Sequence, residues 1–322
     1  MEDSFEFRQW DELIPDALGL IFRNLSLQEV LTIVPRVCKS WGKAARGPYC
    51  WQEIDIEEWS KNHCPDNLDR MLQLLITRSC GSLRKLCVSG LSREGSFSFI
   101  ANNAKSLQVL RLPKSEIGDS VFEQVAGMFL NITFLDVSYC IKIGARALEA
   151  IGKHCKCLTG LRRTMHPLEV IGKLSQDDEA LAIASTMPNL KQLEIAYMLV
   201  GTTSIIEVLK RCRRLELLDV RGCWNVNLDE NFVKKFHQLK VVGPIVIDCN
   251  DRNDWDSFSE YSSSSGYVRW WDFVAGDMDD DNDFDEISDV YWEDDQDIED
   301  FEMWFYDDLN AVDSGYDWPQ SP

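Results

Sequence analysis

Residues 107–112 read LQVLRL, and residues 132–137, 25 positions later, read ITFLDV. Both segments place apolar residues at the first, fourth and sixth positions. The same spacing returns, as a full or partial match, at Leu83-Leu86-Val88, Leu107-Leu110-Leu112, Ile132-Leu135-Val137, Leu158-Leu161, Leu190-Leu193-Ile195, Leu215-Leu218-Val220 and Leu239-Val242. Successive starts are separated by 24, 25, 26, 32, 25 and 24 residues, so this part of the chain is built from repeated units.

This period is that of a leucine-rich repeat, in which each unit supplies one short strand and one helix. Apolar residues at helical spacing, such as those in residues 147–151 and 205–209, fill the intervals between the strands. Because stacked units bury a continuous core, the sequence predicts an α/β fold. We expect a curved leucine-rich-repeat solenoid of about seven repeats over residues 57–249.

The fourth repeat is irregular: it has 32 residues, and residues 166–175 supply most of the excess. Insertions in solenoids emerge as loops on one face and often contribute to recognition. The sequence therefore predicts a surface loop at this point. His166 is expected to be a surface residue of that loop without a catalytic role.

Five of the eleven cysteines follow the repeats. Cys80, Cys155 and Cys212 each stand three residues before the first leucine of a unit, and Cys140 and Cys223 stand three residues after its last apolar strand position. Buried cysteine behaves as a small hydrophobe, so we expect these side chains in the core. The alternative is a metal site around Cys155, but no second Cys/His pair has a suitable spacing, and the sequence predicts no metal.

Side chains alternate along a strand, so the residues between the buried leucines point to the opposite face of the sheet. One interpretation of this row is an ordinary solvated face. Phe134 and Leu217, exposed among mixed charges, instead indicate a protein-binding surface. The candidate binding residues on this face are Lys85, Arg111, Phe134, Asp136, Arg162, Gln192, Glu194, Leu217, Asp219 and Arg221.

Residues 10–56 precede the repeats and predict three short helices. Pro15 fits the first turn of a helix, where its missing N–H costs nothing. Ser26 and Glu29 have the spacing of a capping box, which opens the second helix. Pro35 marks a junction, because proline cannot continue that helix without losing a hydrogen bond.

The third helix is expected to carry Val37, Cys38 and Trp41 on one side and to end at Gly47-Pro48. Three helices of this length cannot bury all of their large apolar side chains among themselves. The surplus predicts a surface that binds a partner.

Several short motifs in this segment resemble the F-box, namely Leu13-Ile14-Pro15, Ile21-Phe22, Val37-Cys38-Lys39-x-Trp41 and Trp51. Their order and spacing match over the whole motif, with Ile14 where that family usually has leucine. Together with the repeats, the chain resembles F-box/leucine-rich-repeat proteins from residue 10 to about residue 249. The cysteine positions are similar to those of the cysteine-containing repeat subtype, and the plant branch is the most similar.

This resemblance implies a Skp-type adaptor as partner and, through it, the cullin and RING subunits of a ubiquitin ligase. A protein substrate would then bind the concave strand face. The alternative interpretation of residues 10–56 is a plain three-helix cap on the repeats. The candidate adaptor-binding residues are Leu13, Ile14, Pro15, Leu18, Ile21, Phe22, Leu25, Leu31, Val34, Val37, Cys38 and Trp41.

The net charge of −21 resides in the C-terminal segment. Residues 250–322 hold 24 acidic residues against only Arg252 and Arg269, whereas residues 1–249 hold 30 acidic and 31 basic residues. High charge of one sign predicts a disordered acidic tail, although its sixteen aromatic residues could bind basic partners. Residues 1–9 are assigned to a short N-terminal arm.

One internal partner for that tail is a row of basic residues that stacking would align along one rim of the repeats. Binding of the tail to this row would mask it until a substrate competed. The alternative is that these residues are ordinary cations near helix C-termini, where the helix dipole favours them. The row comprises Arg78, Lys105, Lys153, Lys156, Lys210, Arg213 and Lys234.

The motifs favour a non-catalytic adaptor over other classes of protein. There is no phosphate loop, paired-histidine metal motif or nucleophile elbow, so we expect no catalytic residues and no cofactor. A balanced body and an acidic tail argue against nucleic acid, and no apolar run is long enough for a membrane span. Without a signal-peptide pattern, the nucleus or cytoplasm is expected. A ligase-independent repeat scaffold or inhibitor remains the alternative function.

Overall fold

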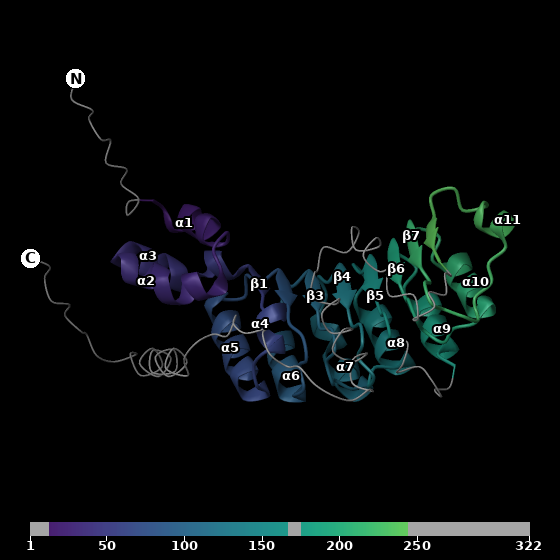
Figure 1. Ribbon diagram of the computed structural model, residues 1–322, viewed down its shortest axis with the longest axis horizontal. Coiled ribbons are helices and arrows are strands. Elements are labelled where there is room, and N and C mark those ends of the chain that lie inside the picture. The colour runs from purple at the N-terminus through teal and green to yellow at the C-terminus, as the bar shows by residue number, and fades with distance from the viewer. Residues whose placement is uncertain (1–12, 167–174, 244–322) are drawn as a thin grey trace, which may run out of the picture. The chain divides into compact units, whose positions relative to one another are not determined.

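The computed structural model describes residues 13–166 and 175–243, which form a parallel sheet of eight strands in the order β1-β2-β3-β4-β5-β6-β7-β8 (Figure 1). Each strand pairs with the next one in the sequence, and the register is constant from one unit to the next. The strands are β1 (Glu53–Asp55), β2 (Lys85–Cys87), β3 (Val109–Arg111), β4 (Phe134–Asp136), β5 (Gly160–Arg162), β6 (Gln192–Glu194), β7 (Leu217–Asp219) and β8 (Lys240–Val242).

The intervals between the strands are helical, and Figure 1 shows most of these helices in a row along one side of the sheet. They are α4 (Glu57–Lys61), α5 (Pro65–Arg78), α6 (Glu94–Asn103), α7 (Asp119–Val125), the 3₁₀ turn η4 (Ala126–Met128), α8 (Ala145–His154), α9 (Asp177–Thr186), α10 (Thr202–Arg211) and α11 (Glu230–Val233). Among the described residues, no helix combines the length and the apolar character that a membrane span requires.

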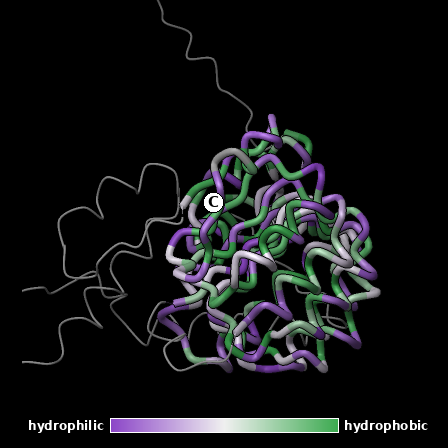
Figure 2. The backbone as a smooth tube through the Cα atoms, turned by 90° about the vertical axis from the view of Figure 1, so that its right-hand side faces the viewer, coloured by the Kyte–Doolittle hydropathy of each residue, from purple (hydrophilic) through white to green (hydrophobic). Residues whose placement is uncertain are grey.

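The hydrophobic core lies between the sheet and these helices. The middle residue of each strand from β1 to β7 faces the helices and is at most 2% exposed, as for Leu86, Leu135 and Leu218. Burying a side chain of this size stabilises the fold by roughly 1.5–3 kcal/mol. Figure 2 shows the resulting alternation of hydrophobic and hydrophilic stretches along the turns of the backbone. The predicted leucine pattern therefore identifies the core correctly.

The first strand lies inside the segment assigned to the N-terminal helices. β1 pairs Ile54 with Leu86, so the sheet begins before residue 57. The leucine pattern does not predict this strand, because Glu53-Ile54-Asp55 offers a single apolar residue.

The register of the last repeat differs by one residue from the prediction. The leucine spacing aligns Leu239 and Val242 with Leu215 and Leu218, but the structure pairs Leu218 with Val241. A slip of one residue exchanges the two faces of a strand. Val241 and Val242 are both β-branched and apolar, so the pattern alone cannot distinguish the two registers.

The N-terminal segment is helical, with α1 (Pro15–Phe22), a π-helical turn η2 (Glu29–Ile33), α2 (Val34–Val37), α3 (Lys39–Arg46) and a 3₁₀ turn η3 (Pro48–Trp51). The capping box is present: the Ser26 backbone N–H donates to the Glu29 carboxylate, and the Glu29 N–H donates to Ser26 Oγ. Pro35 stands in the first turn of α2, directly after the π-helical turn, and the backbone stays helical through the predicted junction.

Four of the five repeat cysteines are buried as predicted, at most 4% exposed. Each thiol also reaches a backbone carbonyl oxygen of the preceding repeat. The pairs are Cys140 with Leu112 (3.1 Å), Cys155 with Ala126 (3.7 Å), Cys212 with Met187 (3.4 Å) and Cys223 with Ile195 (3.2 Å). Cys80 contradicts the prediction: it is exposed, in a turn with φ of 49°.

The fourth repeat carries a buried arginine where the other units have an apolar residue. Arg163 is 1% exposed, and its Nε lies 3.2 Å from the Glu179 carboxylate. Its guanidinium also donates to the Ile143 carbonyl oxygen at 2.8 Å. His166 is 3% exposed, which corrects the prediction of a surface residue, and burial lowers its pKa. Residues 167–174 of the predicted loop lie outside the described residues.

The cysteine geometry predicts which thiols react in the native protein. Burial raises the pKa of Cys155 and Cys212 to about 11 and that of Cys223 to about 12. With iodoacetamide at neutral pH, we expect rapid labelling of exposed Cys64, Cys80 and Cys157 and protection of the four buried cysteines, measured by peptide mass spectrometry. Labelling of the buried set at the rate of Cys157 would contradict this packing.

The same thiols predict a dependence of stability on pH. Their folded-state pKa values lie above the unfolded value of 9.0, so the folded state binds more protons between the two. The contribution is therefore complete below about pH 9 and is lost as the pH rises toward 11. We expect the free energy of unfolding in urea to fall over this range, and Cys212→Ala should flatten the decline.

Candidate functional site

Exposed apolar side chains are concentrated on the N-terminal helices. Within residues 13–166 and 175–243, twelve large hydrophobic side chains are exposed, and six of them belong to residues 14–37. We call these six the N-terminal apolar surface: Ile14, Leu20, Ile21, Leu25, Ile33 and Val37, which are 38–66% exposed. An aliphatic set this dense, left uncovered by the rest of the described chain, is typical of a protein-binding surface.

A second set of apolar residues holds these helices together. Phe22 packs against Trp41, with ring centroids 5.1 Å apart. The Trp51 indole N–H donates to the Ala45 carbonyl oxygen at 2.8 Å and so joins η3 to α3. The helices therefore have a small core of their own, and their outer apolar residues are not needed for it.

The twelve candidate adaptor contacts divide between core and surface. Leu18, Phe22, Leu31 and Val34 are at most 5% exposed, so these four are core residues and cannot contact a partner directly. Ile14, Pro15, Ile21, Leu25 and Val37 are exposed, and Leu13, Cys38 and Trp41 are half-buried.

The sequence predicts Val37 and Cys38 within the third helix. Instead, Val37 is the last residue of α2, and Cys38 is the N-cap of α3. The Cys38 sulfur accepts a hydrogen bond from the Trp41 backbone N–H at 3.4 Å. Leu20 and Ile33 belong to the exposed set and were not predicted. They lie on the sides of their helices opposite the buried residues. A short helix with apolar residues on both sides cannot bury all of them, and this pattern could have predicted their exposure.

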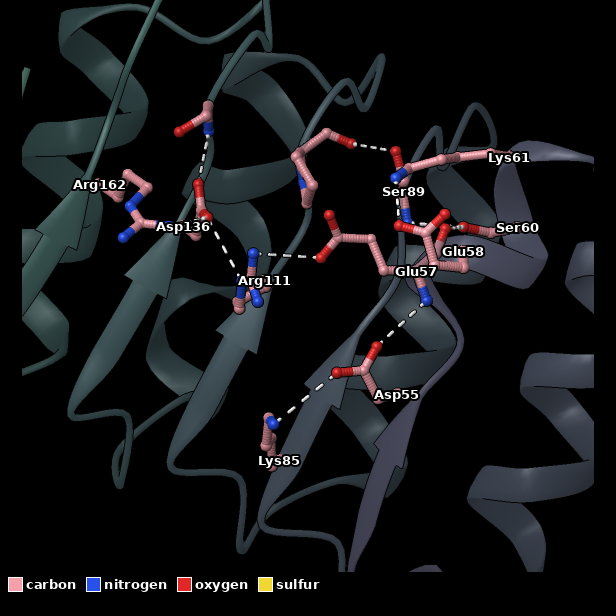
Figure 3. A network of polar contacts seen from close by, with 12 residues as sticks. Asp55, Glu57, Glu58, Ser60, Lys61, Lys85, Ser89, Arg111, Asp136 and Arg162 are labelled. Atoms are coloured by element: carbon pink, nitrogen blue, oxygen red, sulfur yellow. Dashed lines mark hydrogen bonds and ion pairs between the residues drawn. The ribbon is translucent and has the colours of Figure 1, made fainter. Parts of the chain in front are cut away.

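The strand face carries a network of ion pairs (Figure 3). In the constant register, the third residues of β3, β4, β5 and β6 are Arg111, Asp136, Arg162 and Glu194. Asp136 lies between two arginines, 3.4 Å from Arg111 Nε and 3.6 Å from Arg162 Nη1. Arg162 also donates two hydrogen bonds to the Glu194 carboxylate, at 2.6 and 3.1 Å. The charges thus alternate across four strands.

The network reaches the segment after β1 through Glu57. The Glu57 carboxylate lies 3.2 Å from Arg111 Nη2 and is 7% exposed. Burial raises the pKa of Glu57, and Arg111 opposes that effect. The network therefore connects the first strand, next to the N-terminal helices, with the sixth.

Two of the candidate binding residues are much less accessible than expected. Asp136 and Asp219 are 0% and 5% exposed, because neighbouring arginines cover them. Asp219 pairs with Arg221, at 2.6 Å between Nη2 and Oδ2. These two carboxylates are internal partners of the arginines rather than contacts for a ligand. The predicted direction of the alternate side chains holds, but their exposure depends on the charged residues beside them.

Phe134 lies against the glycine of the next strand. A Cβ atom at Gly160 would come within 2.5 Å of the Phe134 ring, so only glycine leaves room for this position of the ring. The Arg162 guanidinium carbon lies 5.9 Å from the ring centroid. Phe134 is therefore held from two sides and is half-buried. Gln192 and Leu217 are also half-buried, and Lys85 pairs with Asp55 at 3.8 Å.

The sequence was compared with known proteins. No family model matches the chain. It is 57% identical over 283 residues to "F-box protein FBW2" of Arabidopsis thaliana, which covers 86% of this chain and 89% of that protein. It is 32% identical over 240 residues to "F-box protein SKIP19" of the same plant, covering 74% and 77%. The chain belongs to the F-box family.

A further relative includes the repeats in its name. The F-box chain is 28% identical over 238 residues to "Putative F-box/LRR-repeat protein 23" of Arabidopsis thaliana, covering 73% of this chain and 53% of that protein. The resemblance drawn from Leu13-Ile14-Pro15 and the leucine spacing is thereby confirmed.

Most basic residues of the row expected along the rim of this F-box protein are buried or already contact other groups of the repeats. Arg78 is 8% exposed, so it does not belong to a surface row. Lys153 pairs with Glu149 at 2.6 Å, and Lys156 donates to the Gly152 carbonyl oxygen at the end of α8. These contacts favour the interpretation as cations near helix C-termini. The tail of residues 250–322 lies outside the described residues, so its binding to the row stays a prediction.

The segment around Cys155 does not have the geometry of a metal site. Cys155 points into the core, whereas Cys157 is exposed. In the described ranges, no three His, Cys, Asp or Glu side chains are grouped closely enough to hold a metal ion.

The ion-pair network predicts a difference between two aspartates. Asp136→Asn leaves Arg111 and Arg162 largely buried without their shared carboxylate and should lower the free energy of unfolding by about 2–3 kcal/mol. Asp55→Asn removes an exposed carboxylate 3.8 Å from Lys85 and should change it by less than about 1 kcal/mol. Urea unfolding followed by circular dichroism measures both. Equal effects would show that the network adds nothing to stability.

Proposed function

We propose that this chain is the substrate-recognition subunit of a Skp–cullin–F-box ubiquitin ligase. The observation that carries the proposal is the N-terminal apolar surface. Six aliphatic side chains in 24 residues are exposed on helices that already have their own core around Phe22 and Trp41. Selection for folding alone does not explain them, whereas docking on a Skp-type adaptor would bury them.

The docking helices and the repeats are joined without a flexible linker. η3 leads directly into β1, and the Arg84 backbone N–H donates to the Gln52 carbonyl oxygen at 2.7 Å. Ser82 Oγ lies 3.4 Å from the Pro48 carbonyl oxygen, and the Arg78 guanidinium carbon lies 6.0 Å from the Trp51 ring centroid. A substrate on the strand face would therefore be held in a defined position relative to the adaptor.

The proposed contribution to ubiquitin transfer is proximity. Holding two reactants in a fixed arrangement converts an encounter between free molecules into an intramolecular step. The chain itself would supply no catalytic group, and cullin and RING subunits would join through the adaptor. The ten cysteines of the described part are free thiols, which suits the reducing environment of the nucleus or cytoplasm.

Adaptor binding should depend on exposed apolar residues. The double variant Ile33→Asp, Val37→Asp replaces two side chains that are each 56% exposed, so it should fold normally. We expect its affinity for a purified Skp-type adaptor to fall at least tenfold, because charges would be desolvated in an apolar interface. Calorimetric titration of the full chain measures the affinity.

The matched control is Leu130→Asp, at a side chain 60% exposed on the repeats, which should bind like the wild type. Phe22→Ala serves as a contrast: it empties a buried site and should lower the melting temperature. If the folded wild type does not bind the adaptor, the proposal is wrong and a ligase-independent scaffold or inhibitor is favoured.

A further inference from the structure

Four basic residues on α2 and α3 form a second feature of the N-terminal helices. We call Arg36, Lys39, Lys43 and Arg46 the cationic strip; all four side chains are exposed. Lys39, Lys43 and Arg46 are spaced by four and three residues, so they lie on the same side of α3. Residues 30–52 contain no aspartate or glutamate, so no acid on these helices balances the strip.

The cationic strip has no ion pair within the described chain. The lysines and arginines of the repeats differ in this respect, since many of them pair with an acid on the same or a neighbouring unit. Examples are Lys142 with Glu116 (2.8 Å), Lys153 with Glu149 (2.6 Å), Lys191 with Glu216 (3.0 Å) and Arg211 with Glu207 (2.6 Å).

Helix stability does not account for the strip. Lys43 and Arg46 stand in the last turn of α3, where the helix dipole favours a cation. Lys39 is the first residue of α3, where the dipole disfavours one. The pairs Lys39–Lys43 and Lys43–Arg46 also place like charges at spacings that repel. The strip thus carries a repulsion that folding leaves in place and that an anionic partner would relieve.

The strip adjoins the N-terminal apolar surface. Exposed Val37 follows Arg36 directly in α2 and stands two residues before Lys39. Ile33, also exposed, precedes Arg36 by one helical turn. A partner that covered Ile33 and Val37 would bring its own rim next to the cations.

We infer that the Skp-type adaptor binds these helices through an apolar groove bordered by acidic side chains, and that the acidic border pairs with Arg36, Lys39, Lys43 and Arg46. This inference rests on the proposed function, because it takes the adaptor as the occupant of the apolar surface. It adds the chemistry of the adaptor's rim and the role of the cationic strip in association.

Two other anionic partners fit the strip less well. Helices that lie in a membrane interface are commonly longer and anchored by aromatic residues, whereas α1 and α3 have eight residues each and the apolar surface is aliphatic. Nucleic-acid binding requires a positive field over a wide surface, whereas residues 1–249 are nearly neutral, with 30 acidic and 31 basic residues. A protein with a local acidic rim matches both the size and the composition of the strip.

Charge complementarity of this kind acts mainly on the rate of association. Opposite charges at the rim of an interface steer the encounter, and salt screens them within about 8 Å at physiological ionic strength. The apolar contacts, which are short-ranged, govern dissociation instead. The two parts of the surface are therefore separable by kinetics.

The test compares three forms of the full-length protein by surface plasmon resonance against a purified Skp-type adaptor. The first is the wild type. The second is the triple variant Lys39→Glu, Lys43→Glu, Arg46→Glu. The third is the control Arg84→Glu, Lys105→Glu, Arg214→Glu, which makes the same change of charge at exposed cations of the repeats that also have no ion pair within the described chain.

In low salt, we expect the α3 variant to associate at least tenfold more slowly than the control, with a similar dissociation rate. At about 0.5 M salt, where screening is strong, the difference should shrink to less than about threefold. Circular dichroism should show the same helix content in all three forms, since the substituted side chains are exposed.

Two results would overturn the inference. One is an association rate that is the same for the α3 variant and the control while the wild type binds the adaptor; that result leaves the proposed function intact. The other is wild-type binding to phosphatidylserine vesicles that the α3 variant loses while it keeps its adaptor association rate. No adaptor binding by the wild type at any salt concentration would instead remove the proposed function itself.

Discussion

Each strand of the sheet pairs with the next in the same register, and this constraint decides what the rest of the molecule can be. Leu86, Leu110 and Leu135 stand at equivalent positions of successive strands, so they fill one continuous core. The same register places the third residues of the strands in a second row on the opposite face. Side chains far apart in sequence, such as Arg111 and Arg162, become neighbours of the same carboxylate only because the register does not slip.

The parts of this fold that sequence predicts well are those in which one residue type has one role. The leucines at positions one and four of the units from Leu83 to Leu218 are buried, and the intervals between the strands are helical. Leu239, in the last unit, is only half-buried. β1 is not predicted because Ile54 is its only apolar residue. Its pairing with β2 defines the strand, and the local sequence carries no repeat pattern that would indicate it. Val241 and Val242 fit either face equally well, so the choice between them is made by pairing with β7.

Exposure of charged residues follows a different rule, because neighbours decide it. Asp136 points away from the leucine core as alternation predicts, yet Arg111 and Arg162 cover it completely. Arg163 shows the opposite case: it occupies a position where most units have an apolar residue, and it is buried with Glu179.

The exposure of apolar residues in the N-terminal helices also depends on their neighbours. Leu18 and Leu20 are the same residue type two positions apart, but Leu18 is buried and Leu20 is exposed. A sequence motif shows that both residues are apolar, but it does not show which of them is exposed to a partner.

The charges of the strand face restrict how that face can recognise a protein. Arg111 and Arg162 are each held by two carboxylates, so an anionic group on a substrate would first have to displace Asp136, Glu57 or Glu194. Displacing a partner from a largely buried pair leaves that carboxylate uncompensated, which is costly. Contacts with Phe134 and Leu217 displace no buried ion pair. The Phe134 ring already lies against Gly160, which has no Cβ that would clash with it. A rigid aromatic side chain loses little conformational freedom on contact. The physical balance on this face therefore favours contacts with Phe134 and Leu217 over new ion pairs with the arginines.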